Sequence, residues 1–446
     1  MGVLIWIFSA NFVELSLRLK SFDFSRGRKK GCKDHGATKS KQHASSPNSV
    51  ESVVLTRSAV GATVTAMEPT KDPGITNRLL SLDVFRGVTI AAMILVNDAG
   101  DEPSSYWPLK HAEWNGWTPT DLIFPFFLFI VGVAMTFSMS TRLKRGETRQ
   151  QLLLHALWRG FILFAIGVAL HALPWPNFAT LRIYGVLQRI AVCYVISAII
   201  ALWVGKRGQW AIIFICLAGY WIMMRFIPVP GFGIPGHDVP LLDPDRNIVA
   251  WLDRKLLMGR LYEGTRDPEG VLSTIPAIAT CLLGLMVGDW LRSERSQRVK
   301  AFGMAAFGGI GAVAGIVMSA WFPINKKLWT SSFVVFTAGM ALICLALCYW
   351  LVDIQRWRHW TKPILVFGAN SIAAYVFADF LAISLNRLQI HGADGASVSY
   401  SQFIYERFCT SWLDPANASL LYALVFVAIC WVAMAILYRK RIFVKI

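Results

Sequence analysis

Long apolar segments recur along most of this chain and restrict what it can fold into. A helix that crosses a bilayer needs roughly 17–25 mostly apolar residues, because each backbone polar group must find its hydrogen-bond partner inside the segment. Segments of this length cover residues 79–99, 120–140, 152–173, 181–204, 210–228, 272–291, 302–322, 329–352, 363–385 and 419–438. Charged residues make up only 16% of the chain and its mean hydropathy is +0.48, which is too apolar for a soluble domain of 446 residues. The sequence therefore predicts an all-α polytopic membrane protein with about ten transmembrane helices.

Basic residues are concentrated in alternate loops between these segments. The formal net charge of +17 would suggest a nucleic-acid partner for a soluble protein, but here the basic residues follow every second span. They are Arg142, Lys144, Arg145, Arg149, Lys206, Arg207, Arg292, Arg295, Arg298, Lys300, Arg356, Arg358, Lys362, Arg439, Lys440, Arg441 and Lys445. By the positive-inside rule, such loops face the cytoplasm. We therefore expect both termini in the cytoplasm, His111 on the external side, a lipid bilayer around the chain and no nucleic-acid partner.

The first 75 residues differ in composition from the rest. Residues 25–49 are polar, basic and without hydrophobic periodicity, which is typical of a disordered segment. Met67 lies shortly before the first span, so translation that begins there instead of at Met1 is a second possibility. We interpret residues 1–75 as a disordered extension or an artefact of the gene model, and residues 76–446 as the transmembrane domain.

The sequence shows neither the residue spacing of a metal site nor a nucleotide-binding motif in the segments where we would expect one. Cys344 and Cys348 are one helical turn apart but have no further His or Cys nearby, so we interpret them as small core residues and expect no metal. Residues 229–270 form the longest loop between spans and contain neither a P-loop nor a metal-ligand pattern. Their many Gly, Pro and Asp residues favour a lid or a substrate-binding loop.

Ionisable side chains within the first span are candidates for function, because a charge inside a bilayer is costly. Asp83 and Arg86 lie three residues apart, so they either neutralise each other or bind substrate. Asn97 follows Arg86 by eleven residues, so the two point to the same side of the helix, about 16 Å apart along its axis. One face of this helix would therefore carry a guanidinium group at its inner end and an amide at its outer end.

Two later spans carry polar side chains of the same kind. Arg189 lies in the fourth span, where we expect it to bind an anion or to pair with a carboxylate such as Asp83 or Asp379. Asn370 and Ser371 lie in the inner half of the ninth span, where they either bind substrate or form hydrogen bonds between helices. These residues join the substrate-binding candidates.

The segment KHAEWNGWTPTDLIFPFF, residues 110–127 and hereafter the outer motif, places a histidine and carboxylates at the mouth of the second span. His111 lies in a loop, where packing does not require an imidazole, and histidine suits base or nucleophile chemistry at neutral pH. Asp121 or Glu113 could orient its ring, as the carboxylate of a catalytic triad does. An inert, exposed histidine is the alternative. Five other histidines compete for the role: His155, His171, His237, His359 and His391.

Part of the outer motif is explained by its place at the membrane surface. Trp114 and Trp117 suit the aromatic belt of a membrane protein. This does not explain Glu113 and Asn115, which we therefore include among the substrate-binding candidates.

Four sequence motifs in the first four spans belong together. They are SLDVFRG, the Asn97 that ends the first span, KHAEWNGWTPTDLIFPFFLFIVG and GVLQRIA. Together they resemble the heparan-alpha-glucosaminide N-acetyltransferase family, and its shorter bacterial members in particular. The resemblance extends from residue 78 to the C-terminus and is most specific in the first four spans. Family members are multi-helix membrane acyltransferases that use cytosolic acetyl-CoA to acetylate the amino group of a terminal glucosamine on the far side of the membrane.

The resemblance implies roles for residues and for partners. His111 matches the active-site histidine of the family, and Asn97 matches its partner asparagine. Either the imidazole carries the acetyl group or it acts only as a base, and both routes are chemically available. Acetyl-CoA would be the co-substrate and an envelope amino sugar or glycan the acceptor. Residues 76–446 would be a transmembrane acyltransferase domain in the bacterial inner membrane, and the family suggests a homodimer.

The implied chemistry uses both ends of the first span. A CoA that enters from the cytoplasm would contact Arg86, and also Arg189, through its phosphates, and its pantetheine arm would reach His111. Asn97 would then donate to the developing oxyanion. The catalytic candidates are thus His111, Asn97 and Asp121. The substrate-binding candidates are Asp83, Arg86, Glu113, Asn115, Arg189, Asn370 and Ser371.

Two other classes of function compete with an acetyltransferase. An inner-membrane amino-sugar transporter would use buried Arg, Asp and Asn side chains to line a pathway. Many transporters show internal repeats, however, and the two halves of this chain show none that is convincing. A structural membrane protein would leave the arginines within the spans unexplained. Acid–base residues in an exposed loop favour chemistry over passage.

Overall fold

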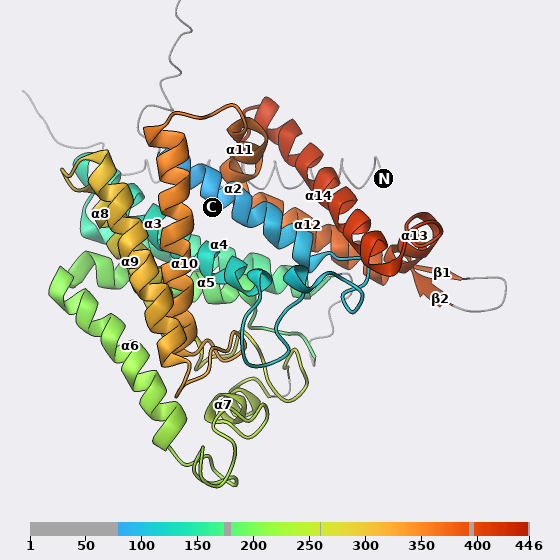
Figure 1. The fold of residues 1–446 in the computed structure, drawn as a ribbon, viewed down its shortest axis with the longest axis horizontal. Coiled ribbons are helices and arrows are strands. Elements are labelled where there is room, and N and C mark those ends of the chain that lie inside the picture. The colour runs from blue at the N-terminus through green and yellow to red at the C-terminus, as the bar shows by residue number, and fades with distance from the viewer. Residues whose placement is uncertain (1–78, 174–179, 259, 392–396, 445–446) are drawn as a thin grey trace, which may run out of the picture. The chain divides into compact units, whose positions relative to one another are not determined.

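The computed structural model describes residues 79–173, 180–258, 260–391 and 397–444 of the chain (Figure 1). Most of these residues are helical. Among them, β structure is confined to isolated bridges and a two-stranded antiparallel ladder of β1 (Gln389–His391) and β2 (Ser397–Ser399). The predicted N-terminal extension, residues 1–75, lies outside the described residues, so its disorder stays a prediction.

Nine helices in the described part of the chain are long and apolar enough to cross a membrane. They are α2 (Leu80–Asn97), α3 (Ile123–Lys144) with the turn η2 (Pro119–Leu122) before it, α4 (Arg149–His171), α5 (Val186–Trp203), α6 (Lys206–Phe226), α8 (Thr274–Arg292), α9 (Gln297–Met318), α10 (Ser331–Tyr349) with the turn η3 (Trp350–Ile354) after it, and α14 (Pro415–Arg439). Shorter helices lie in the loops: η1 (Trp107–Leu109), α7 (Ile248–Leu256) and α13 (Tyr400–Phe408). Each long helix overlaps one predicted span, so the prediction of an all-α polytopic membrane protein is confirmed.

The ninth predicted span is not one straight helix, which corrects the sequence prediction. It consists of α11 (Thr361–Ala369) and α12 (Ser371–Arg387), which meet at Asn370 with a bend of 80°. The side-chain amide of Asn370 donates to the carbonyl of Ile442 at 3.1 Å and accepts from the N–H of Val444 at 2.9 Å. The hydrophobic pattern of the span does not reveal such a bend, because the backbone groups that stabilise it belong to the C-terminal segment, 72 and 74 residues later in the chain.

Helices α3 and α8 approach each other closely at two glycines in the centre of the bundle. A Cβ atom at Gly132 would lie 1.9 Å from the carbonyl oxygen of Cys281, and one at Gly284 would lie 2.1 Å from that of Phe129. Small residues let membrane helices pack backbone against backbone. This contact fixes the helix whose first residues are the last residues of the outer motif.

Gly132→Ala is expected to lower the stability of the folded protein. Its Cβ would force α3 and α8 apart, and overpacking of this kind costs about 1–3 kcal/mol. The measurement is the midpoint of thermal unfolding of the purified protein in detergent. Gly309→Ala on α9 is the matched control, because a Cβ there meets no atom within 4 Å. Equal midpoints for the two variants would contradict the close packing.

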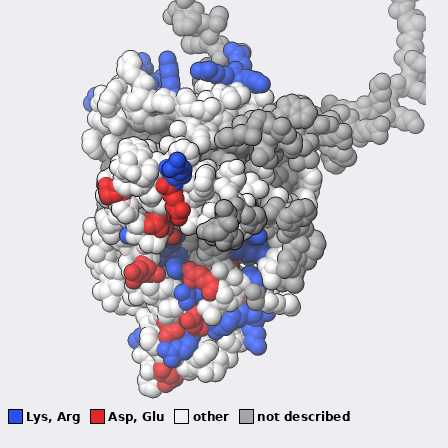
Figure 2. Space-filling view, turned by 90° about the vertical axis from the view of Figure 1, so that its right-hand side faces the viewer, with Lys and Arg blue, Asp and Glu red and all other residues white. Residues whose placement is uncertain are grey.

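The two ends of the bundle differ in charge. Figure 2 shows basic side chains at the upper end of the drawn face and a mixture of acidic and basic side chains toward the lower end. The upper end holds the loops between α8 and α9 and between α10 and α11, and the lower end holds the segment around α7 (Figure 1). This distribution agrees with the alternating basic loops of the sequence, which the positive-inside rule assigns to the cytoplasm.

Candidate functional site

His111 lies in the loop between η1 and η2 and contacts the side chain of Asp121. Its Nδ1 is 2.8 Å from Oδ1 of Asp121, and the imidazole is 37% exposed whereas the carboxylate is 1% exposed. A buried carboxylate that accepts from Nδ1 sets the orientation of the ring and leaves Nε2 available for a proton or an acyl group. The structure therefore brings two of the three catalytic candidates together.

Asp121 is held in place by the turn in which it lies. Thr118 and Asp121 form a capping box around η2: Oδ2 of Asp121 accepts from the backbone N–H of Thr118 at 3.0 Å and from its hydroxyl group at 3.1 Å. The N–H of Ala112 donates to the same oxygen at 3.1 Å. Oδ1 is thereby left for His111. The sequence TPTD thus gives a rigid carboxylate, because threonine favours the cap and proline favours the first position of the turn.

Lys326 is a third member of this cluster, and sequence reasoning missed it. It lies in the loop between α9 and α10, with Nζ 2.9 Å from Nδ1 and 3.3 Å from Nε2 of His111, and 3.5 Å from Oδ1 of Asp121. Its side chain is 21% exposed. Burial lowers the pKa of its ammonium group, although the neighbouring carboxylates of Asp121 and Glu269 oppose this. The available signal was a lysine pair, Lys326 and Lys327, in a loop predicted to be external, where the positive-inside rule disfavours lysine.

The loop that carries Lys326 also holds the outer motif. The amide of Asn325 is buried and donates to the carbonyl of Trp114 at 2.9 Å and to Oδ1 of Asn115 at 3.2 Å. The N–H of Gly116 donates to the carbonyl of Ile324 at 2.8 Å. These bonds join two segments that are far apart in sequence. They also give Asn115, a predicted substrate-binding residue, a structural partner.

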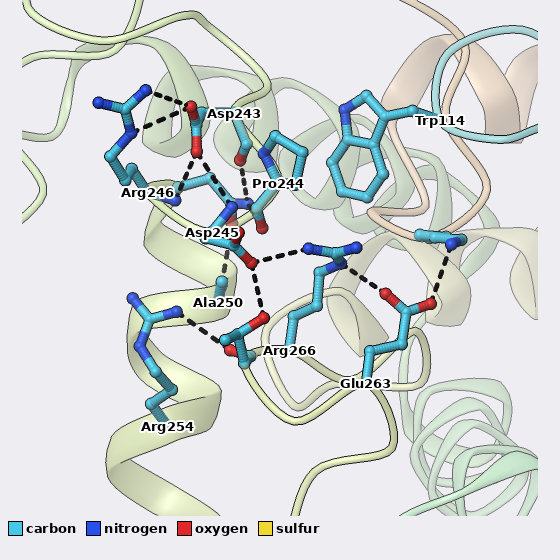
Figure 3. A network of polar contacts seen from close by, with 12 residues as sticks. Trp114, Asp243, Pro244, Asp245, Arg246, Ala250, Arg254, Glu263 and Arg266 are labelled. Carbon is cyan, nitrogen blue, oxygen red and sulfur yellow. Dashed lines mark hydrogen bonds and ion pairs between the residues drawn. The ribbon is translucent and has the colours of Figure 1, made fainter.

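The long outer loop contacts the same motif through Trp114 (Figure 3). The indole N–H of Trp114 donates to the carbonyl of Leu242 at 2.7 Å, and the guanidinium group of Arg266 lies 5.1 Å from the ring centroid. Arg266 is in turn paired with Asp245 at 2.7 Å and with Glu263 at 2.5 Å. The loop that we expected to act as a lid or to bind substrate therefore packs against the outer motif.

Helix α2 carries Arg86 in its second turn and Asn97 at its last residue. Nη1 of Arg86 is 3.0 Å from Oδ1 of Asp83 and donates to the carbonyl of Gly368 in α11 at 3.4 Å. The expected pairing of Asp83 with Arg86 is therefore present. Asn97 is exposed at the far end of the helix.

Arg189 lies near the outer motif. It is fully buried in the first turn of α5, where Nη2 donates to the carbonyl of Gly270 at 3.0 Å and to the hydroxyl of Ser273. Its guanidinium group lies 5.1 Å from the ring centroid of Trp329, three residues after Lys326. The hydrogen-bond partners of Arg189 are therefore neutral groups. Neither Asp83 nor Asp379, the carboxylates expected from the sequence, is among them.

Arg86 and Arg189 lie toward opposite ends of α10, which corrects the expectation that both contact the phosphates of one CoA. Trp329, beside Arg189, comes two residues before α10. Near Arg86, the N–H of Ser81 donates to Asp353 in the turn after α10 at 3.3 Å. A helix of 19 residues is about 28 Å long, so this separation is too large for a shared phosphate. The sequence did not show it because spacing within one span says nothing about where a second span begins.

Three further candidates lie away from His111 or point outward. Asn370 and Ser371 lie at the bend between α11 and α12, two and three residues after Gly368, whose carbonyl accepts from Arg86. In this structure the amide of Asn370 holds the C-terminal segment. Glu113 is exposed in the outer motif.

A cavity of about 330 Å³ lies at the end of the bundle where α2 begins. Its lining residues are Leu79, Gln297, Tyr349, Asp353, Arg356 and Arg358. Two guanidinium groups beside one carboxylate suit a ligand that carries phosphate.

Comparison with known proteins assigns this chain to a family. A family model described as heparan-alpha-glucosaminide N-acetyltransferase, catalytic, matches residues 78–322. The heparan-alpha-glucosaminide N-acetyltransferase of Homo sapiens is 31% identical over 431 residues, which cover 83% of this chain and 60% of the human protein. The protein of the same name from Mus musculus is 30% identical over 430 residues, which cover 83% of this chain and 61% of the mouse protein. The chain thus spans about three fifths of the length of these relatives.

Proposed function

The chain belongs to the heparan-alpha-glucosaminide N-acetyltransferase family, and from this premise we propose that it is a membrane acetyltransferase that acts on the amino group of a glucosamine-type sugar. The observation that carries the proposal is the contact between His111 and the buried carboxylate of Asp121 in an outer loop. A histidine oriented in this way acts either as the base that deprotonates the sugar amine or as the nucleophile that takes the acetyl group first. Both routes use Nε2.

The acetyl donor in this proposal is acetyl-CoA that enters from the cytoplasm. The cavity at the start of α2 supports this side of entry, because Arg356 and Arg358, which line it, belong to one of the basic loops. Arg86 lies in the second turn of the same helix. From Arg86 to the end of α2, eleven residues span about 16 Å, which is within reach of an extended pantetheine arm. Asn97 ends this path, where it would donate to the reacting carbonyl.

Arg86→Ala is expected to weaken the binding of acetyl-CoA about tenfold or more. A hydrogen bond that involves a charged group contributes about 1.5–3 kcal/mol, and the variant loses such bonds to phosphate. Equilibrium binding of acetyl-CoA to the purified protein measures the effect. Arg142→Ala is the matched control, because Arg142 also pairs with a carboxylate, that of Glu147, but lies in the last turn of α3 and not on α2. Unchanged affinity in Arg86→Ala would refute this donor site.

The proposal includes an orientation and a location. Residues 76–446 form the transmembrane acyltransferase domain, both termini face the cytoplasm and His111 faces the external side. The protein lies in the bacterial inner membrane, as a homodimer, with an amino sugar or a glycan of the envelope as acceptor. The basic loops at one end of the bundle support this orientation.

The test of the proposed function is acetyl transfer by the purified protein in detergent. Radiolabelled acetyl-CoA is incubated with glucosamine, and with N-acetylglucosamine as a control whose amine is already blocked. Labelled N-acetylglucosamine should form from the first sugar, and the second sugar should acquire no label. Folded protein that binds glucosamine without forming product would refute the acetyltransferase.

An amino-sugar transporter is the second candidate, and the bend between α11 and α12 favours it. Broken helices are common in transporters because they expose backbone groups to a substrate at the middle of the membrane. The bend in this chain is instead bonded to Ile442 and Val444. Uptake of labelled glucosamine into proteoliposomes without acetyl-CoA would decide for the transporter.

A further inference from the structure

Lys326 is placed where the acyl-transfer reaction would develop negative charge. Its Nζ lies within 3.3 Å of both ring nitrogens of His111. Whichever nitrogen faces the acyl group, the ammonium is therefore beside it. An ammonium has three N–H donors, and its contact with Asp121 uses one of them. Nδ1 of His111 donates to Asp121 and cannot also accept from the ammonium, so a donor is left for a further partner.

We propose that Lys326 is a catalytic residue whose ammonium group stabilises the oxyanion formed from the acetyl carbonyl during transfer. The inference rests on the proposed function and assigns a residue that neither the sequence motifs nor the family match includes, since the match ends at residue 322. Lys326 thus adds a charged donor to the amide donor expected from Asn97.

The reaction step needs such a donor by either route. In the direct route, the sugar amine forms a bond to the thioester carbon, Nε2 of His111 takes its proton, and the C=O electron pair moves onto oxygen. When this oxyanion collapses, the C–S bond breaks and the CoA thiolate takes up the proton from Nε2. In the acyl-histidine route, Nε2 attacks first and CoA leaves as the thiolate. The sugar amine then attacks the acetyl carbon, a second oxyanion forms and collapses with cleavage of the C–Nε2 bond, and the amine proton passes to the thiolate. Lys326 donates a hydrogen bond throughout and transfers no proton. Removing one oxyanion donor typically costs about 10²–10³-fold in kcat.

The position of Lys326 is fixed before any substrate binds. The carbonyl of Lys326 accepts from the N–H of Trp329 at 3.0 Å, and Trp329 is itself buried. On the other side, the buried amide of Asn325 ties the loop to the outer motif. A fixed, largely buried charge stabilises a transition state more than a mobile, solvated one, because it need not reorganise.

A purely structural role for Lys326 would be to neutralise Asp121, and the thermal midpoint, measured across the same pH series as kcat, separates the two roles. Loss of a structural charge would lower the midpoint together with kcat, whereas loss of a catalytic charge lowers kcat alone. The charged groups that act on the Lys326 ammonium are Asp121, Glu269 and Lys327, and the neutral or charged imidazole of His111 lies beside it. Burial lowers the pKa of Lys326, so the ammonium is lost at a lower pH than for an exposed lysine. Activity that depends on this charge therefore falls on the alkaline side. An arginine stays protonated there.

The experiment compares Lys326→Met and Lys326→Arg in the acetyl-transfer assay, across a pH series. We expect the methionine variant to lose about 10²–10³-fold in kcat, with little change in KM for acetyl-CoA. We expect the arginine variant to recover much of this loss and to shift the alkaline fall of kcat to higher pH. Lys327→Met is the matched control, because the Lys327 ammonium pairs with Glu263, 2.9 Å away. This variant should have an unchanged kcat.

Three outcomes would overturn the assignment. One is a wild-type kcat in Lys326→Met, and another is equal loss in the methionine and arginine variants with an unchanged pH profile, which would mark a structural role. The third is a similar loss in Lys327→Met. Elution from a sizing column and the thermal midpoint show whether each variant is folded. Wild-type protein that forms no product would instead refute the proposed function, so the two failures are distinguishable.

Discussion

His111→Ala should abolish detectable acetyl transfer to glucosamine. If the imidazole acts as the base, its loss should lower kcat about 10²–10⁴-fold, and if it carries the acetyl group, the loss should be larger still. The binding of acetyl-CoA should change little, because the phosphate-binding candidate Arg86 lies toward the other end of α2. The measurements are the initial rate with labelled acetyl-CoA and the equilibrium affinity for the donor.

The control for this variant is His237→Ala. His237 lies in the long outer loop, its side chain is 82% exposed, and it pairs with Asp238 much as His111 pairs with Asp121. The His237→Ala variant should transfer acetyl groups at the wild-type rate. Substantial transfer by folded His111→Ala protein would show that the outer motif is not the reaction site, and loss of transfer in both variants would point to a general effect on the loops.

Asp121→Asn is expected to lower kcat by about 10²–10⁴-fold while the protein remains folded. The carboxylate accepts from Nδ1 of His111 through one oxygen and from Thr118 and Ala112 through the other. An amide of the same shape can keep only one of these two sets of acceptor bonds. If its NH₂ group faces the ring, Nδ1 must become the acceptor and Nε2 carries the proton, which is the wrong tautomer for a base or a nucleophile.

The readout for this variant separates chemistry from stability. The rate is measured beside the thermal midpoint, with Asp414→Asn as the control. Asp414 also makes cap bonds, as the N-cap of α14, and asparagine caps helices equally well. A loss of activity in proportion to a loss of folded protein would assign Asp121 to the turn alone. A wild-type rate in Asp121→Asn would exclude the triad-like role.

The contact between His111 and Asp121 could be predicted from the sequence. His111 and Asp121 are ten residues apart, and a short turn with a strong cap signal joins them, so their contact follows from local rules. The pairing of Asp83 with Arg86 is local in the same way, because three residues separate them on one helix. Local spacing was less informative for Arg189, since its surroundings come from Gly270, Ser273 and Trp329.

The length and apolar character of each segment determined the helices, and the alternation of basic loops predicted which ends share a side. These properties can be read along the chain, because a bilayer requires each span to satisfy its own backbone. Only the tertiary structure decided that Lys326 joins His111, 215 residues away, and that Asn370 marks a bend secured by the C-terminal segment. Both depend on which loops meet when the helices pack, and that is set by contacts such as Gly132 against Cys281, which have no periodic signature in the sequence.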